Sequence, residues 1–293
     1  MASDQPWTIG RLLEWTTDFF KRRGFSSPRL DAEVLLADAR GCQRIELYTA
    51  FDQLADDSTR DRFRQLVRRR ATGEPVAYLV GRREFFSLPL VVTTDVLIPR
   101  PETELVVTAA LDAIKGYSIS GRPVDVVDVG TGSGAIAVSI AKQAANSRLT
   151  ATDVSSAALE VAKQNAQRLA VDDRVALVLA DLLSTLPDTQ RFDFLVSNPP
   201  YVSETELAEL PADVRDHEPH QALLGGPTGV EVIQRLVPQA ADRLRSGGAA
   251  FIEISPMIER QVTELFDQEP RFAAATVVKD LSGLARVVTA QRK

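Results

Sequence analysis

The sequence has one cysteine and two histidines among its 293 residues. A single thiol, Cys42, cannot form an internal disulfide, which excludes a small secreted scaffold held together by disulfides. The histidines, His217 and His220, stand on either side of Pro219 in a segment with loop character. Zinc sites in proteins are built mainly from cysteine and histidine side chains, and this sequence has only three of them. We therefore expect no metal in the functional site.

Long hydrophobic runs are missing too. The most apolar stretches, "VDVVDVG" and "GGAAFIEIS", are far shorter than the roughly 20 residues that a membrane-spanning helix needs. The first residues lack the basic and then apolar pattern of a signal peptide. With 44% hydrophobic and 25% charged residues, the composition is that of an ordinary globular protein, which we expect to be cytoplasmic and to have no membrane partner.

The chain also lacks an overall excess of positive charge. Its net charge of −6 argues against a general nucleic-acid binder, so no direct nucleic-acid binding is expected. Positive charge is nevertheless concentrated in "RDRFRQLVRRR", from Arg60 to Arg70, and at Arg82 and Arg83. This basic run is either the solvated face of a helix or a docking surface for an acidic partner, and the sequence leaves both open.

A chain of this length is expected to form two domains, and the first of them is predicted to be helical over residues 1–82. The stretch "IGRLLEWTTDFF" repeats apolar residues at helical spacing after Thr8, a plausible N-cap. The next helix begins with Ser27 as cap and Pro28 at the first position, and ends at Gly41. In "STRDRFRQLVRRRATG", Ser58 and Asp61 have the spacing of a capping box.

Residues 83–98, "REFFSLPLVVTTDVLI", are dense in aromatic and β-branched residues and predict a β-hairpin connector. Residues 99–293 then alternate short apolar strands with helices of about 10 to 15 residues. This alternation predicts an α/β fold, a Rossmann-like, seven-stranded, doubly wound and mostly parallel sheet. The expected strands are "VDVVDV", "RLTATD", "VALVLAD", "FDFLVS", "AAFIEI", "FAAATVV" and "ARVVTA". In such sheets ligands bind beyond the carboxyl ends of the strands.

The first of these strands ends in "DVGTGSGAIA", a turn with Gly130, Gly132 and Gly134. Glycines there let the chain turn sharply and leave backbone that a ligand can approach closely. The pattern is GxGxG rather than the GxGxxG of a pyrophosphate site, and no Lys-Ser/Thr pair follows it, which excludes a P-loop.

Polar side chains follow the next three strands. Asp153 lies 23 residues beyond Gly130 and is placed to accept hydrogen bonds from a ribose diol. Asp181 follows the third strand, within reach of an adenine amino group, and Asn198 follows the fourth. An acid after a strand is more often a helix cap than a ligand, but four such strand ends together predict a bound nucleoside with a reactive group facing the fourth strand.

The fourth strand runs into Asn198, Pro199, Pro200 and Tyr201, "NPPY". Two successive prolines remove two backbone donors and stiffen the turn, which leaves its carbonyls without local partners. The glycine turn with the acid after the second strand resembles the S-adenosylmethionine site of class I methyltransferases. "NPPY" resembles the signature of those that methylate an amide or amino nitrogen of DNA, rRNA or protein.

Two flanking segments narrow the resemblance. "IPRPETELVV" before the first strand and "DVRDHEPHQALLGGPTGVEVI" after NPPY resemble the HemK/PrmC family, which methylates the side-chain amide of the glutamine in the Gly-Gly-Gln motif of peptide chain release factors. The family also has a small helical N-terminal domain and a β-hairpin, so the resemblance covers essentially the whole chain. One departure is His217, where the family usually has an aromatic residue.

The resemblance implies S-adenosyl-L-methionine as cofactor, S-adenosyl-L-homocysteine as product and release factors as protein substrates, with residues 1–82 recognising the substrate and residues 99–293 forming the methyltransferase domain. The implied catalytic residues are Asn198, Pro199 and Tyr201, and the implied substrate-binding residues are those three with Pro200. The implied cofactor-binding residues are Gly130, Thr131, Gly132, Ser133, Gly134, Asp153, Asp181, Leu182 and Asn198.

Three alternatives stay open at this stage. The sister family that methylates a ribosomal-protein glutamine shares the NPPY motif but usually has a different N-terminal region. A DNA or rRNA amino methyltransferase is disfavoured by the acidic catalytic half and by the lack of an evident domain for base flipping. A non-catalytic binding module would require a degraded glycine turn or a lost NPPY, and both are intact here.

Overall fold

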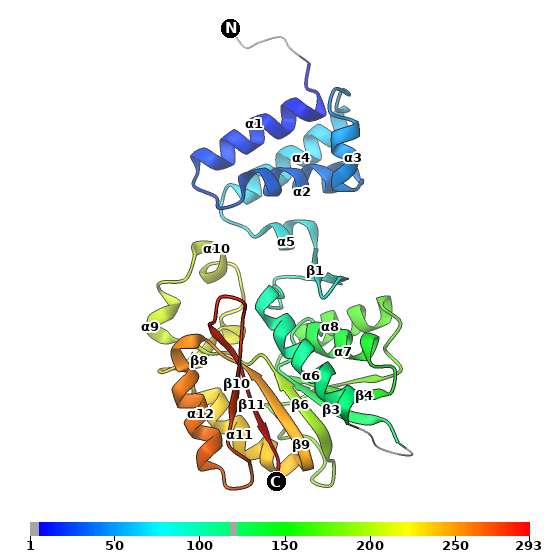
Figure 1. Cartoon of the computed structure of the whole chain (residues 1–293). Helices are drawn as coiled ribbons and strands as arrows, with labels where there is room; N and C mark the ends of the chain where they lie inside the picture. Colours follow the sequence, from blue (N-terminus) through cyan, green and yellow to red (C-terminus); the bar gives the residue numbers. More distant parts are fainter. Residues whose placement is uncertain (1–5, 118–121) are drawn as a thin grey trace. The chain divides into compact units, whose positions relative to one another are not determined.

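The computed structural model describes residues 6–117 and 122–293. These residues separate into two compact units. The helical unit comprises the chain up to Gly81 together with residues 212–217, and the sheet unit comprises Arg82–Pro211 and Glu218–Lys293. The segment 212–217, between NPPY and the rest of the sheet unit, therefore packs with the N-terminal helices. The labels used below are those of Figure 1.

The helical unit packs short amphipathic helices around one apolar core. Thr8 caps the first helix by accepting from the Arg11 backbone N–H at 3.2 Å, as its sequence predicted. The second helix starts at Pro28 and ends at Gly41, whose φ of 71° is the left-handed conformation that glycine adopts without strain. The helices are α1 Ile9–Arg22, α2 Pro28–Arg40, α3 Arg44–Thr49, α4 Asp57–Arg70, α5 Val76–Val80 and α10 Ala212–Arg215.

The predicted start of α4 was wrong. Ser58 lies inside the first turn, and the N-cap is Asp56, whose carboxylate accepts from the Thr59 backbone N–H at 2.8 Å and from the Ser58 hydroxyl at 2.6 Å. An aspartate accepts these donors better than a serine does because its oxygens are charged. The helix therefore begins two residues earlier than the capping-box spacing indicated.

The basic run on α4 forms ion pairs within the helical unit. Arg70 bonds to Asp31 at 2.9 Å with both side chains largely buried, and Arg62 reaches Asp38 at 2.8 Å. Arg60, Arg64 and Arg69 pair with Asp57, Asp61 and Glu74. This local pairing neutralises much of the charge that the run could otherwise offer to an acidic partner, and it favours the solvated helix face over the docking surface.

A two-stranded antiparallel hairpin opens the sheet unit. Its strands are β1 Arg82–Phe85 and β2 Leu88–Val91, and Phe85 and Leu90 reach into the core beneath. The hairpin connector was thus predicted correctly in kind but extended too far. Residues 92–98 are not paired in the hairpin; they contain a turn in which the Val96 backbone N–H donates to the Thr93 carbonyl at 3.2 Å.

The described residues of the sheet unit form a seven-stranded sheet in the order β10-β11-β9-β6-β3-β4-β5. Strands β3, β4, β5, β6 and β9 are parallel, and β11 inserts antiparallel between β9 and β10. The predicted fold class, a Rossmann-like, seven-stranded, doubly wound sheet with a small helical N-terminal region, is confirmed. The strands are β3 Val124–Val129, β4 Ser147–Asp153, β5 Val175–Leu179, β6 Phe192–Ser197, β9 Leu244–Glu253, β10 Thr276–Lys279 and β11 Ala285–Gln291.

Helices cover both faces of this sheet, because the strands are apolar on both faces (Figure 1). One core lies under α6, α7 and α8, and the other under α11 and α12. Alternate residues of β3 divide between them, with Val126 in the first and Val127 in the second. The helices are α6 Glu104–Gly116, α7 Ala135–Gln143, α8 Ser156–Arg168, α11 Glu231–Arg243 and α12 Glu259–Gln268.

Short elements complete the unit at the carboxyl edge of the sheet. They are the 3-10 turns Pro101–Thr103, His220–Ala222 and Pro256–Ile258, the helix α9 Glu204–Leu207, and the paired strands β7 Val202–Ser203 and β8 Leu224–Gly226. Among the residues 6–117 and 122–293, we find no helix that combines the length and hydropathy of a membrane span.

A buried carboxylate holds the amino ends of the strands together. Asp193 on β6 is fully buried and accepts from Arg122 at 2.6 and 2.7 Å and from the Asp125 backbone N–H at 2.8 Å. It also forms an ion pair with Arg245 at 3.1 Å. These donors favour the charged form over the opposing effect of burial, and the pKa of Asp193 lies below its ordinary value of 3.8. The network lies at the opposite edge of the sheet from the strand ends that carry the motifs.

We expect Asp193→Asn to destabilise the protein by about 2 to 4 kcal/mol at neutral pH, because it removes the fully buried anion and leaves the two arginines with only the less buried carboxylate of Asp125. Since the folded-state pKa is depressed, the contribution is present above pH 3.8 and is lost as the pH falls through the folded value. Urea unfolding should therefore show a gap between wild type and variant that narrows in acid.

Asp188→Asn is the matched control, because Asp188 also pairs with an arginine but its side chain is fully exposed. We expect this control to change stability by less than about 1 kcal/mol. Equal losses for the two variants would show that Asp193 has no special role.

Candidate functional site

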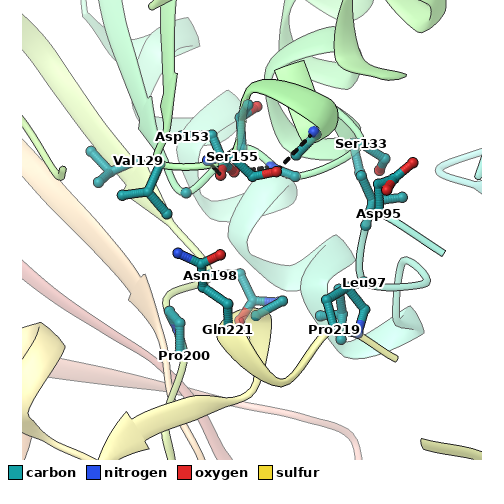
Figure 2. A pocket seen from close by; sticks show the side chains of 18 of the residues that line it. Asp95, Leu97, Val129, Ser133, Asp153, Ser155, Asn198, Pro200, Pro219 and Gln221 are labelled. Carbon is teal, nitrogen blue, oxygen red and sulfur yellow. Dashed lines mark hydrogen bonds between the residues drawn. The ribbon is translucent and has the colours of Figure 1, made fainter. Parts of the chain in front are cut away.

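A cavity of about 490 Å³ lies at the carboxyl ends of β3, β4 and β6, where doubly wound sheets bind their ligands. Asp153 and Ser155 line one side of it, and Asn198, Pro200 and Gln221 line the other (Figure 2). The glycine turn, Asp153, Asp181 and Asn198, which are distant in sequence, are therefore brought to one cavity.

The glycine turn connects β3 to α7 through left-handed backbone. The φ angles of Gly130, Gly132 and Gly134 are 73°, 54° and 80°, which residues with a Cβ rarely adopt. A Cβ at Gly134 would also lie 3.2 Å from the Cβ of Ala162 on α8. Gly130, Thr131, Gly132 and Ser133 line the cavity, whereas Gly134 serves the packing of α7 against α8.

Asp128, one residue before the end of β3, is fully buried and supports the glycine turn from the core, which its sequence position did not indicate. Its Oδ2 accepts from the Thr131 hydroxyl at 2.6 Å and from the Ala137 backbone N–H at 3.1 Å, so it braces both ends of the glycine turn. Its Oδ1 is buried and meets no hydrogen-bond donor in the described part of the chain. Burial raises the pKa of Asp128 to about 7.

Asp153 ends β4 with its carboxylate at the same turn. Oδ2 accepts from the Gly132 backbone N–H at 2.8 Å and Oδ1 from the Ser155 backbone N–H at 2.9 Å. Burial raises the pKa of Asp153, and these backbone donors oppose the rise. Each carboxylate oxygen can accept a second hydrogen bond, so Asp153 can brace the turn and still receive a diol from the cavity.

Asp181 and Leu182 follow β5 and line the cavity beside Asp153. Asp181 is exposed and forms an ion pair with Arg235 of α11, which also lines the cavity. Leu182 has a φ of 54°, unusual for a leucine, and its side chain is buried in the core under α11 and α12. Asp181 was predicted from its place after the strand, whereas its arginine partner was not.

The NPPY turn follows β6. Asn198 and Pro200 line the cavity; of the described residues, Pro199 and Tyr201 do not belong to its lining. The Asn198 side-chain Nδ2 donates to the Thr103 hydroxyl at 3.1 Å, and the Tyr201 hydroxyl donates to Glu253 Oε1 at 3.2 Å. The turn is thus held from behind by polar contacts that the sequence reasoning did not identify.

The segment that follows the β-hairpin forms another wall of the cavity. Asp95 and Leu97 lie on it, and Pro219 lies beside Leu97 (Figure 2). Glu218, which is buried, accepts from the Ile98 backbone N–H at 3.1 Å and from Arg100 at 2.5 Å. This ion pair joins the "IPRPETE" and "RDHEP" segments. Arg100 occupies the N-cap position of the turn Pro101–Thr103 without capping it, so its side chain braces the wall rather than the helix start.

Arg215 and His217 belong to the helical unit, in the segment that contains α10. The His217 ring lies beside Gly73, whose φ is 100°, and a Cβ at that glycine would come within 3.4 Å of His217 Nε2. The histidine that replaces the usual aromatic residue therefore packs within this unit. Gln221, three residues past Glu218, lines the cavity and was not predicted as a site residue.

Two family models match the chain. Residues 11–81 match the PrmC N-terminal domain, and residues 117–212 match the methyltransferase small domain.

Curated relatives match over nearly the full length. The release factor glutamine methyltransferase of Rhodopirellula baltica is 52% identical over 99% of this chain and 98% of its own length. That of Koribacter versatilis is 40% identical over 91% of this chain and 92% of its own.

Solved structures show the same fold at low identity. The hMettl16 catalytic domain in complex with a 3'UTR hairpin is 17% identical, with a TM-score of 0.57 over 77% of this chain and 80% of that one. A T. Thermophilus 16S rRNA methyltransferase in complex with AdoMet and guanosine is 20% identical, with a TM-score of 0.51 over 72% and 50%.

Proposed function

The chain belongs to the release factor glutamine methyltransferase family, and on that premise we propose how its cavity serves the reaction. Members of the family methylate a glutamine of release factors, and this chain is such a methyltransferase. We propose that the cavity binds S-adenosyl-L-methionine and that Asn198 presents to it the side-chain amide of the glutamine in the Gly-Gly-Gln motif. The observation that carries the proposal is that Asn198 faces the same cavity as Asp153 and the glycine turn.

The cavity suits this cofactor in size and chemistry. Its volume of about 490 Å³ lies in the range of cofactor sites. Gly130 and Gly132 leave open space where a Cβ would stand, which lets the cofactor approach the backbone. Asp153 can accept from the ribose hydroxyls, and Asp181, which pairs with Arg235, can accept from the adenine amino group. When bound, the cofactor supplies an electrophilic methyl group on a sulfonium.

The residues of NPPY orient the substrate. An amide nitrogen is a poor nucleophile because its lone pair is delocalised into the carbonyl. The Asn198 Oδ1 and the Pro199 carbonyl oxygen can each accept one N–H of the substrate amide, which holds the nitrogen in place and directs its remaining lobe toward the methyl donor. Such positioning contributes up to about 7 to 11 kcal/mol when the geometry approaches in-line attack.

The step also releases a proton. As the nitrogen gains a methyl group it becomes strongly acidic, so one of its protons passes to solvent water, and no dedicated general base is required. Pro200 stiffens the turn. Tyr201, which packs against the core under α11 and α12 and donates its hydroxyl to Glu253 at 3.2 Å, anchors the end of the turn.

We also propose that residues 1–82 recognise the release factor. Exposed large apolar side chains on this unit support the idea, because they are available for contact with a protein partner. The most exposed are Ile45, Tyr48 and Leu54, at 67%, 50% and 68%. The match of residues 11–81 to the PrmC N-terminal domain supports it further.

Methyl transfer from radiolabelled S-adenosyl-L-methionine tests the proposal. Purified release factor, the same factor with its Gly-Gly-Gln glutamine changed to glutamate, ribosomal protein, DNA and rRNA are assayed in parallel. We expect label only on the unmodified release factor. Label on the glutamate variant would place the modification at another residue, and label on ribosomal protein or nucleic acid would reassign the substrate.

A further inference from the structure

Asn165 on α8 is a polar residue on a helix face that is otherwise apolar. Its side chain is 0% exposed, and the other buried residues of this helix are Ala158, Val161, Ala162 and Ala166. Asparagine is a poor helix former, and a buried amide costs free energy unless its donors and its acceptor are bonded. An asparagine at this position is therefore expected to hold partners that an apolar residue could not.

Asn165 has three such partners, and all of them are backbone groups. Its Oδ1 accepts from the Val91 N–H at 2.7 Å, and its Nδ2 donates to the Val91 carbonyl and to the Ser133 carbonyl, each at 2.9 Å. Only one orientation of the amide fits these groups, because its NH₂ end faces two acceptors and its oxygen faces a donor. One side chain thus connects β2, α8 and the turn after β3.

These partners lead to two parts of the cavity. Val91 is the last residue of β2, and the chain that follows it becomes the wall that carries Asp95 and Leu97. Ser133 lines the cavity from the glycine turn, and Figure 2 shows it on the same side as Asp95. Asn165 therefore fixes where the wall starts and where the glycine turn stands relative to it.

The bond to Ser133 also fixes a peptide group of the glycine turn. The Ser133 carbonyl is bonded to Asn165, and the Gly134 N–H of the same peptide group donates to the Thr131 carbonyl at 2.8 Å. Because a peptide group is planar, its carbonyl and its N–H turn together. Loss of the Asn165 amide would leave this carbonyl without its donor and release the peptide group to rotate, which changes the backbone that a ligand approaches.

We propose that Asn165 is a positioning residue for cofactor binding. Its amide holds the wall segment, residues 92–98, and the glycine turn in a fixed arrangement, and this arrangement gives the cavity its fit to S-adenosyl-L-methionine. The inference rests on the proposed function, in which this cavity binds the cofactor. It adds that the affinity depends on a side chain that, among the residues the structure describes, is not part of the cavity lining.

Asn165→Leu tests the inference, because leucine has a similar shape and none of the hydrogen bonds of the amide. By calorimetry we expect the Kd for S-adenosyl-L-methionine to rise about 10- to 30-fold, since two carbonyls and one N–H lose their partner. At saturating cofactor, kcat should stay within about threefold of wild type, because the acceptors for the substrate amide lie on the NPPY turn. A purely structural role would instead reduce the folded fraction, which lowers kcat and leaves the Kd unchanged.

Asn165→Asp separates the bonds of the amide. A carboxyl keeps an oxygen for the Val91 N–H, but it carries at most one proton and so can donate to at most one of the two carbonyls, whatever its charge. We expect a Kd between those of wild type and Asn165→Leu. Hydrogen exchange should become fast at the Val91 amide only in the leucine variant, while the Ile98 amide, held by Glu218 at 3.1 Å, stays protected in both.

Ser147→Ala is the matched control. Ser147 is 2% exposed at the start of β4, on the amino edge of the sheet, and its hydroxyl donates to the Ala144 carbonyl at 2.7 Å. Like the Asn165 variants, it removes a buried hydrogen bond to a backbone carbonyl, but it does so away from the cavity. We expect a lower melting temperature and the wild-type Kd.

A wild-type Kd in Asn165→Leu, unchanged exchange at its Val91 amide, or an equal rise of the Kd in Ser147→Ala would overturn the inference. Failure of both Asn165 variants to fold would overturn it as well, because Asn165 would then serve the fold rather than the site. The wild type distinguishes this from a failure of the proposed function. If wild-type protein itself does not bind S-adenosyl-L-methionine, the assignment of the cavity is wrong, whereas wild-type binding with an unchanged Asn165→Leu removes only the role of Asn165.

Discussion

Asn198→Ala should lower the rate of methyl transfer to release factor by on the order of 10² to 10³, while leaving the Kd for S-adenosyl-L-methionine within about threefold of wild type. The side chain supplies one of the two acceptors that hold the substrate nitrogen, and the Pro199 carbonyl supplies the other. Alanine removes the first acceptor without filling the cavity. Single-turnover transfer at saturating cofactor measures the rate, and calorimetry measures the affinity.

Asn146→Ala is the matched control for this variant. Asn146 is exposed in the connection before β4, at the amino edge of the sheet, and its backbone carbonyl rather than its side chain accepts from Val124. We expect wild-type turnover from it. Near-normal turnover in Asn198→Ala would contradict the clamp, and a parallel loss of rate and cofactor affinity would make Asn198 a cofactor ligand first.

Much of this site was predictable because parallel strands bring their carboxyl ends to one edge. The glycine turn, Asp153, Asp181 and Asn198 each stand at or just after the end of an apolar strand, and all of them line one cavity. A residue directly after a buried strand has little freedom in where it lies. Its position follows from the local pattern, without knowledge of the packing around it.

The support behind NPPY was missed for a different reason. "AAFIEI" carries the same signal, an acid closing an apolar strand, but Glu253 matters because β9 lies beside β6. Strand order depends on how helices pack on the two faces, which no local pattern expresses. Thr103 is more distant still, since its contact with Asn198 joins residues 95 positions apart.

Two boundary errors have local causes. Ser58 has capping-box spacing, but Asp56 is the N-cap of α4 because its charged carboxylate accepts hydrogen bonds from both the Ser58 hydroxyl and the Thr59 backbone N–H. Residues 92–98 have strand-like composition, yet they stop pairing after Val91 and form a cavity wall instead, held by the Ile98 bond to Glu218. β-branched residues favour strands, but the turn from Thr93 to Val96 interrupts the strand here.

Asp153→Ala should weaken the binding of S-adenosyl-L-methionine by about 100-fold, because it removes a charged acceptor for the ribose and the brace on the glycine turn together. The brace is the 2.8 Å bond from the Gly132 N–H to Oδ2. Calorimetry measures the affinity, and the rate at saturating cofactor should recover to within a few fold of wild type. Asp153→Ala should thus mainly weaken cofactor affinity, whereas Asn198→Ala should mainly lower the rate of transfer.

The pH dependence of cofactor affinity provides a second test of Asp153. Burial raises its pKa above the ordinary 3.8, so in the free protein the carboxyl gains a proton at a higher pH than an exposed aspartate would. A protonated carboxyl loses acceptor capacity, and the affinity of the wild type should weaken as the pH falls toward that value from neutral. Asp153→Asn, which cannot titrate, should bind weakly with less change over the same range. An affinity in Asp153→Ala equal to that of wild type would show that the ribose is held by other groups, and that this carboxylate serves only the geometry of the turn.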